Sequence, residues 1–286
     1  MKKKVKTRKK ITLQSVIMYI LLILTALMFA TPMLFTLLSS IKTKVEIFAK
    51  PFSWPEVPQW SNYVEAWTSA NMSHYFLNSL IQAGATVIVL AIVSTMAAYV
   101  LSRFDFKCNK FLLLFFMLGM MVPVHTVLVP VSYIIGALNL KNNIPALVMI
   151  YVAFSLPFSI LVVTNFMKGV NRSLEEAALI DGATYFQIYK NVMLPMTVPA
   201  ISTISIFNFL GAWNNILFPL LFINDKNLKP IALGLLNFNG ERGSDYGPLM
   251  AAIVITVAVP LVIYLLFQEK VEGGLAAGAV KELSLI

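Results

Sequence analysis

Six long apolar blocks limit what this chain can fold into. Crossing the hydrocarbon core of a bilayer takes about 20 mostly apolar residues in a helix. Blocks of about that length or longer cover residues 15–41, 76–102, 111–138, 144–168, 197–223 and 247–268. Lipid offers backbone polar groups no partner, so only helices and closed barrels span it, and these runs lack the alternation of barrel strands. We therefore predict an all-α integral membrane protein with six transmembrane helices.

The composition argues against a soluble fold and gives no sign of nucleic-acid binding. Of the 286 residues, 58% are hydrophobic and 12% are charged, whereas soluble domains are about 45–50% apolar and about 25% charged. The net charge of +9 comes mostly from a basic run within the first ten residues, so we expect no nucleic-acid partner. We also expect no metal site, and the single cysteine, Cys108, cannot form an internal disulfide.

The distribution of basic residues predicts the orientation. Six spans place both ends of the chain on one side, and Lys and Arg near span ends stay in the cytoplasm. The side that carries the termini holds 15 Lys and Arg, and the other side holds 7. We therefore assign residues 1–14 as a basic cytoplasmic head and 15–268 as the transmembrane domain. Within that domain 169–196 is a cytoplasmic loop, and residues 269–286 form a cytoplasmic tail.

The cytoplasmic loop predicts a helical hairpin outside the bilayer. Ser173 and Glu176 have the spacing of a capping box, in which each side chain bonds the other residue's backbone N–H. We expect a first helix over about 174–180. Gly182 then takes the left-handed conformation that ends helices, and a second helix follows over about 183–193.

The hairpin has two interpretations. As a plain linker, it would use Glu176 only as a cap. As a docking element, it would offer the small side chains of Ala177 and Ala178, which allow another backbone to approach, and a corner at Gly182. An exposed helix of this kind suits a groove on another protein. Pro195 is expected to end the second helix, because proline clashes with the preceding turn.

The loop also resembles a known motif. The matching residues are Glu176-Ala177-Ala178, then Asp181-Gly182-Ala183, then Leu194-Pro195. They are similar to the EAA loop of ABC-importer permeases and lie in the expected cytoplasmic loop. Three further segments are similar to the maltose-type permease subunit of carbohydrate importers. They are residues 273–281, Trp213-Asn214-Asn215 followed by Pro219, and the segment at Tyr246-Gly247.

The resemblance implies a fold, a function and partners. The fold would be that of type I ABC importer permeases, in a bacterial cytoplasmic membrane. The chain would form a pathway for a sugar or oligosaccharide with a second permease subunit, and an external or periplasmic solute-binding protein would deliver the sugar. A dimer of ATP-binding subunits would bind the EAA loop. The chain has no GxxxxGK[ST] phosphate-binding motif, so we expect no enzyme activity in it. ATP and Mg are expected to bind only to the partner ATPase.

Polar residues inside the apolar blocks are candidates for the pathway. They are Asn165, Asn208, Trp213, Asn214 and Asn215. Such side chains suit a neutral, hydroxyl-rich solute, but the same residues also form hydrogen bonds between helices. No Asp, Glu, Lys or Arg lies in the middle of a block. This disfavours the alternative function, an ion-coupled secondary transporter, because such carriers often use charged residues within the membrane.

Overall fold

The computed structural model describes residues 12–68, 71–238 and 245–283, and within these ranges side chains as far as Phe267, apart from that of Asn237. Within these ranges the chain is helical and contains no strand. Residues 1–11 of the expected head and 284–286 of the expected tail lie outside the described residues. The helices long and apolar enough to cross a membrane are α1 (Leu13–Ser39), α4 (Met72–Arg103), α7 (Ile144–Lys168) and, over Tyr246–Phe267, α14 (Tyr246–Leu283).

The third expected span, residues 111–138, is not one straight helix. Its parts are α5 (Asn109–Met121), η1 (Val124–Val127) and α6 (Leu128–Ala137). The chain bends by 89° after α5. Pro123 lacks an N–H and drives the preceding residue out of the helical region, and Val122 accordingly has ψ of 114°. The expected span is therefore broken at this proline, and it counts as one span only if the bent pair is taken together.

The fifth expected span, residues 197–223, is interrupted. Its parts are α11 (Val198–Trp213) and α12 (Leu217–Phe222). Asn215 Oδ1 accepts a hydrogen bond from Phe218 N at 3.1 Å and so caps the second helix. Helical turns from Tyr185 to Met196 precede α11 and meet it at 71°. Among the described residues, four helices thus qualify as spans, or up to six if each bent pair counts as one.

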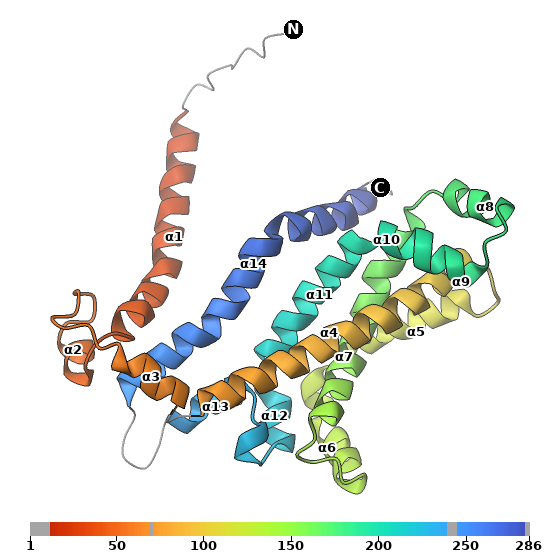
Figure 1. Ribbon diagram of the computed structural model, residues 1–286. Helices are drawn as coiled ribbons and strands as arrows, with labels where there is room; N and C mark the ends of the chain where they lie inside the picture. The colour runs from red at the N-terminus through yellow and green to blue at the C-terminus, as the bar shows by residue number, and fades with distance from the viewer. Residues whose placement is uncertain (1–11, 69–70, 239–244, 284–286) are drawn as a thin grey trace.

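The centre of the molecule is formed by α4, α7 and α11. Helix α4 lies against both α7 and α11, while α14 packs on α11 and α5 packs on α7 (Figure 1). Half of the residues in the most apolar stretch of α7 are buried, but none in that of α1. Helix α1 touches α14 and otherwise stands apart from the bundle (Figure 1).

Short elements gather at two ends of the bundle. At one end, here called the α8 end, are α8 (Ser173–Ile180), α9 (Tyr185–Ile188), the π-helical turn η2 (Tyr189–Met193) and α10 (Leu194–Met196). The start of α1 and the end of α14 lie toward the same upper side of Figure 1. At the opposite, α2 end are α2 (Lys44–Ala49), α3 (Ser61–Thr68), η3 (Lys226–Leu228), α13 (Ile231–Gly234) and η4 (Leu235–Phe238).

Two asparagines hold the segment after α12 at the α2 end. Asn142 has a left-handed φ of 54°, which Asn tolerates better than most residues. Its Oδ1 accepts hydrogen bonds from the backbone N–H groups of Asn224, at 2.6 Å, and Asp225, at 2.9 Å. Asn78 on α4 donates from Nδ2 to the carbonyl oxygen of Asn227 at 2.7 Å. The segment is therefore tied to α4 and to the turn between α6 and α7.

Candidate functional site

Helix α8 forms over the expected residues, but the expected capping box is wrong. Arg172 occupies the N-cap and makes no side-chain capping bond. Ser173 lies inside the first turn, and its backbone N–H donates to Asn171 Oδ1 at 3.1 Å. Asn171 thus takes the Ser173 N–H that was assigned to the Glu176 side chain, while the Glu176 N–H donates to the Arg172 carbonyl oxygen at 3.1 Å. Glu176 is left free of the capping role, and its side chain is exposed.

A capping box does form eleven residues later, at the start of α9. Gln187 N donates to Thr184 Oγ1 at 3.3 Å, and Thr184 N donates to Gln187 Oε1 at 2.7 Å. The sequence carries this signal as Thr-x-x-Gln, a capping box that was not among the predictions. Gly182 has φ of 82°, so the predicted left-handed corner is confirmed. Together these two features set the turn between α8 and α9.

The second helix of the hairpin runs past its expected end. The π turn bonds Leu194 N–H to Tyr189 O, five residues back. Pro195 therefore falls at the start of α10, a position where its missing N–H is tolerated. The prediction that Pro195 ends the helix is wrong. The chain turns at Thr197 instead, whose buried hydroxyl donates to Met193 O at 2.6 Å.

One face of the hairpin is seated on the ends of the long helices. Ile188 and Met193 are buried in a cluster with residues of α4, α7 and α11: Ala98, Tyr99, Val163, Met167, Ala200 and Ile204. The hydroxyl groups of Tyr189 and Thr95 on α4 lie 2.8 Å apart. Ala178 and Ala183 are half-buried against the same cluster. The hairpin is thus a folded part of the bundle rather than a loose linker.

The other face of the hairpin is exposed. Of the predicted coupling residues, Glu176, Ala177, Asp181, Gly182 and Pro195 are exposed, and Leu194 is half-buried. Large apolar side chains share this exposure: Leu174, Leu179, Ile180, Tyr185 and Phe186. Ile180 leaves 87% of its surface uncovered. Large apolar side chains exposed on a short hairpin of this kind mark a surface that meets another protein or the membrane.

A buried ion pair lies beneath α8. Arg103, in the last turn of α4, pairs through Nε with Glu175 Oε1, and the two side chains are 6% and 12% exposed. Burial raises the pKa of the Glu175 carboxyl, and the Arg103 guanidinium opposes that rise. The residue predicted as a site residue was the exposed Glu176, whereas the buried partner of Arg103 is its neighbour Glu175. The available signal was the pair of adjacent acids, since neighbouring residues of a helix face different directions.

The candidate pathway residues divide into buried and exposed sets. Asn208 donates from Nδ2 to Ser159 Oγ on α7 at 3.0 Å, and the buried Trp213 donates from Nε1 to Thr256 O on α14 at 3.2 Å. Asn215 is half-buried and caps α12. Only Asn165 and Asn214 of this set are exposed. Within this chain, three of the five therefore connect or cap helices.

Comparison with known proteins decides the family. Residues 90–276 match the family described as binding-protein-dependent transport system inner membrane component. The chain belongs to this family. The permease is 37% identical over 267 residues to the diacetylchitobiose uptake system permease protein NgcG of Streptomyces coelicolor, covering 93% of this chain and 88% of the relative. It is 35% identical to the probable ABC transporter permease protein YurM of Bacillus subtilis, covering 96% and 92% of the two chains.

A solved structure supports the same fold. The permease matches a chain of a bacterial ABC transporter that imports the acidic polysaccharide alginate, with a TM-score of 0.81 at 20% identity. The match covers 93% of this chain and 99% of that one. The fold is therefore that of a type I ABC importer permease, as the resemblance implied. Family membership makes the chain a permease subunit whose ATP hydrolysis belongs to a separate subunit, and it decides against the ion-coupled alternative.

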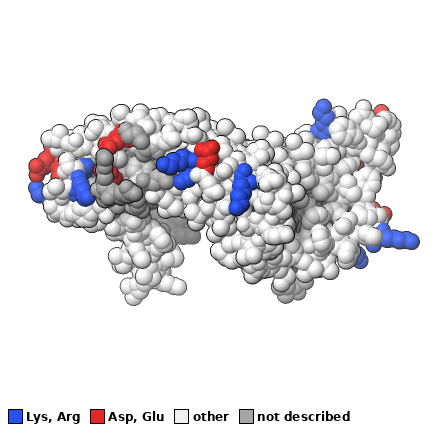
Figure 2. All heavy atoms as spheres, turned by 90° about the horizontal axis from the view of Figure 1, so that it is seen from below, with Lys and Arg blue, Asp and Glu red and all other residues white. Residues whose placement is uncertain are grey.

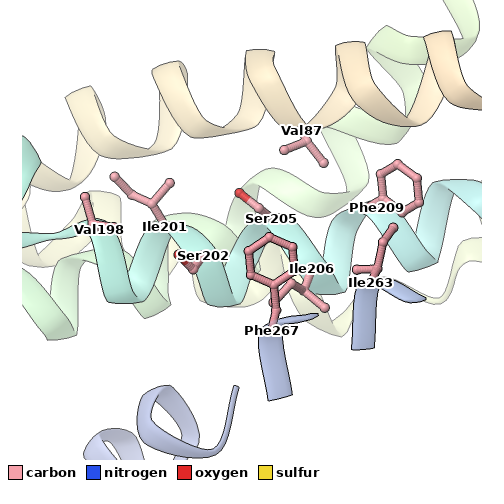
Figure 3. A pocket seen from close by; sticks show the side chains of 9 residues that line it. All are labelled: Val87, Val198, Ile201, Ser202, Ser205, Ile206, Phe209, Ile263 and Phe267. Carbon is pink, nitrogen blue, oxygen red and sulfur yellow. The ribbon is translucent and has the colours of Figure 1, made fainter. Parts of the chain in front are cut away.

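A mostly apolar pocket of about 330 Å³ lies between α4, α11 and α14 of the permease. Figure 3 shows its lining side chains, with Ser202 and Ser205 of α11 among apolar neighbours. The remaining lining residues are Val87, Val198, Ile201, Ile206, Phe209, Ile263 and Phe267. Two hydroxyl groups give a sugar few hydrogen-bond partners, so this pocket suits an apolar occupant better.

Proposed function

We propose that this permease, with a second permease subunit, forms the pathway by which an ATP-driven importer moves a sugar or oligosaccharide across a bacterial cytoplasmic membrane. The observation that carries the proposal is the two-sided hairpin at the α8 end. Its inner face is packed on three long helices, while its outer face leaves Glu176, Ala177 and Ile180 without cover. A rigid element with an uncovered face suits the transfer of movement from a bound partner.

That partner is a dimer of ATP-binding subunits, which alone binds ATP and Mg. Glu176 and Ala177, with the half-buried Ala178, form the contact surface of α8, and Asp181, Gly182 and Ala183 form its corner. Leu194 and Pro195 carry the movement into α11, because α10 leads directly into that helix. Closing of the ATPase dimer would tilt the helices beneath, a rigid-body switch that the bound nucleotide biases.

The orientation follows from the same assignment. The α8 end is cytoplasmic, and so are both termini, since basic residues are concentrated on this side. The solute-binding protein then docks at the α2 end. Seen in Figure 2, from below, charged side chains are sparse and clustered on a mostly uncharged surface. Trp54 and Trp60 are exposed there, and such residues also suit the membrane interface.

Helices that this chain leaves exposed are covered by the second permease subunit and by lipid. Helix α1 has no buried residue before Ser39, so lipid, a second permease subunit, or both surround it. The pathway itself lies between the two permease subunits. Asn165 and Asn214 are the candidates accessible to a solute in this chain, while Asn208, Trp213 and Asn215 shape its wall by holding α11 and α12.

The carbohydrate substrate is supported by the relatives. NgcG is named for diacetylchitobiose uptake, and MsmG of Streptococcus mutans, 29% identical over 267 residues, is named a multiple sugar-binding transport system permease. A second alginate transporter structure, with a TM-score of 0.65, includes a periplasmic protein bound to an alginate pentasaccharide. Asn side chains inside the spans suit hydroxyl-rich solutes, which need hydrogen bonds without charge.

The test is transport by the reconstituted complex. The permease, the second permease and the ATPase would be placed in proteoliposomes, with the binding protein outside and a panel of labelled oligosaccharides. We expect uptake only when ATP is enclosed on the ATPase side and all proteins are present. Uptake driven by a proton or sodium gradient without the ATPase would contradict the proposal. Import of another class of solute, with no import of any sugar, would also contradict it.

A further inference from the structure

The buried ion pair beneath α8 connects more than two residues. Arg103 Nη2 donates to the carbonyl oxygen of Val170 at 3.0 Å and lies 3.6 Å from Met193 Sδ. Val170 follows the end of α7, and Met193 ends the π turn that leads to α10 and α11. The guanidinium group, with its five fixed donors, therefore touches the segments after α7 and before α11 as well as α8.

Both members of the pair occupy favourable helix ends. Arg103 lies in the last turn of α4 and Glu175 in the first turn of α8, where the helix dipoles favour a cation and an anion respectively. Burial raises the pKa of the Glu175 carboxyl, which reflects the removal of this group from water. A buried ionic group without its partner is unfavourable, so α4 and α8 are expected to move together.

No other described side chain ties α8 to α4 in this way. The chain joins α8 to the end of α7 and to the start of α9. The other described charged side chains of α8 and its caps are Glu176, the N-cap Arg172 and the C-cap Asp181, and all three are exposed. Ala178 adds an apolar contact with the cluster beneath. The π turn later in the hairpin also packs on α4, through Tyr189 and Met193, but Arg103 is the charged link that joins α4 to α8 itself.

We propose that Arg103 is a positioning residue that links the ATPase-binding helix α8 to α4 through Glu175, so that movement of α8 displaces α4 together with α7 and α11. This inference rests on the proposed function, since it assigns the route of the movement that the ATPase supplies. Arg103 touches neither the sugar nor the nucleotide. Its loss should therefore reduce the coupling of hydrolysis to transport rather than hydrolysis itself.

The experiment measures sugar imported per ATP hydrolysed, using only assembled complexes in proteoliposomes with the binding protein. We expect Glu175→Gln and Arg103→Gln to lower this ratio about fivefold or more, the lower range of coupling between linked sites. Arg103→Lys keeps the charge but cannot reach all three partners, so an intermediate ratio is expected. Lys107→Gln removes an exposed cation from the loop that follows α4, four residues after Arg103, and should leave the ratio unchanged.

Two results would overturn the inference. One is a wild-type ratio in both Gln variants. The other is a purely structural effect, in which neither variant assembles, or uptake and hydrolysis fall together at an unchanged ratio. An inactive wild-type complex would instead refute the proposed function, and the inference with it. A lowered ratio in an active, assembled complex supports both.

Discussion

Gly182 sets the corner of the hairpin by its backbone rather than by packing. Its φ of 82° lies in the left-handed region, and a Cβ there would meet nothing within 4 Å. For other residues this conformation costs roughly 1–2 kcal/mol, less for Asn. We expect ATP-dependent uptake to fall in the order Gly182, Gly182→Asn, Gly182→Val. Gly211→Ala, at a helical position equally free of neighbours, is the matched control. Equal uptake by the Val and Gly forms would contradict this account.

At the same scale, the sequence predicted residue types better than residue roles. Five of the eight EAA-type residues are exposed and three are half-buried, and Gly182 has its left-handed φ. The capping box was wrong because Asn171 accepts the Ser173 N–H that the Glu176 side chain would have bound, and the Glu176 N–H bonds Arg172 O. Glu175 could not be separated from Glu176 without knowing which face of α8 meets Arg103. Side-chain direction depends on the packing of distant segments, and local patterns do not contain it.

The elements at the α2 end depend on Asn142. Its side chain accepts two backbone hydrogen bonds from the segment after α12, and its φ of 54° suits Asn. Each such bond contributes about 0.5–1.5 kcal/mol, so Asn142→Ala should lower the unfolding temperature in detergent. Asn142→Asp keeps the acceptor and should retain most of the stability. Asn142→Gly loses the same two hydrogen bonds as the Ala form, and differs from it only in lacking the backbone strain. Equal melting of the Ala and Asp forms would contradict this role.

Apolar length predicted which segments meet the membrane but not their shape. Four blocks correspond to unbroken helices. In these blocks either no residue removes a backbone hydrogen bond that the helix needs, or the helix tolerates a proline, as α7 tolerates Pro157. The block at 111–138 bends by 89° at Pro123, where two further residues, Val122 and Val124, leave the α-helical pattern. Whether a proline bends a helix sharply depends on the neighbours that satisfy the freed carbonyl groups, and these neighbours are distant in sequence.

At the scale of the whole molecule, α1 is incomplete without a neighbour. It touches this chain mainly at α14, and its apolar stretch has no buried residue. If a second permease subunit covers it, a photo-reactive benzoylphenylalanine at Leu24, which is 58% exposed, should cross-link to that subunit in the assembled complex. The cross-linked band should disappear when the second permease is omitted, and its mass distinguishes that subunit from a second copy of this chain. The consecutive residues Leu22, Ile23 and Leu24 are all exposed and point about 100° apart around the helix, so probes at these positions sample different directions. Cross-links to lipid alone at all three positions would mean that α1 is only a membrane anchor, and that the pathway is formed without it.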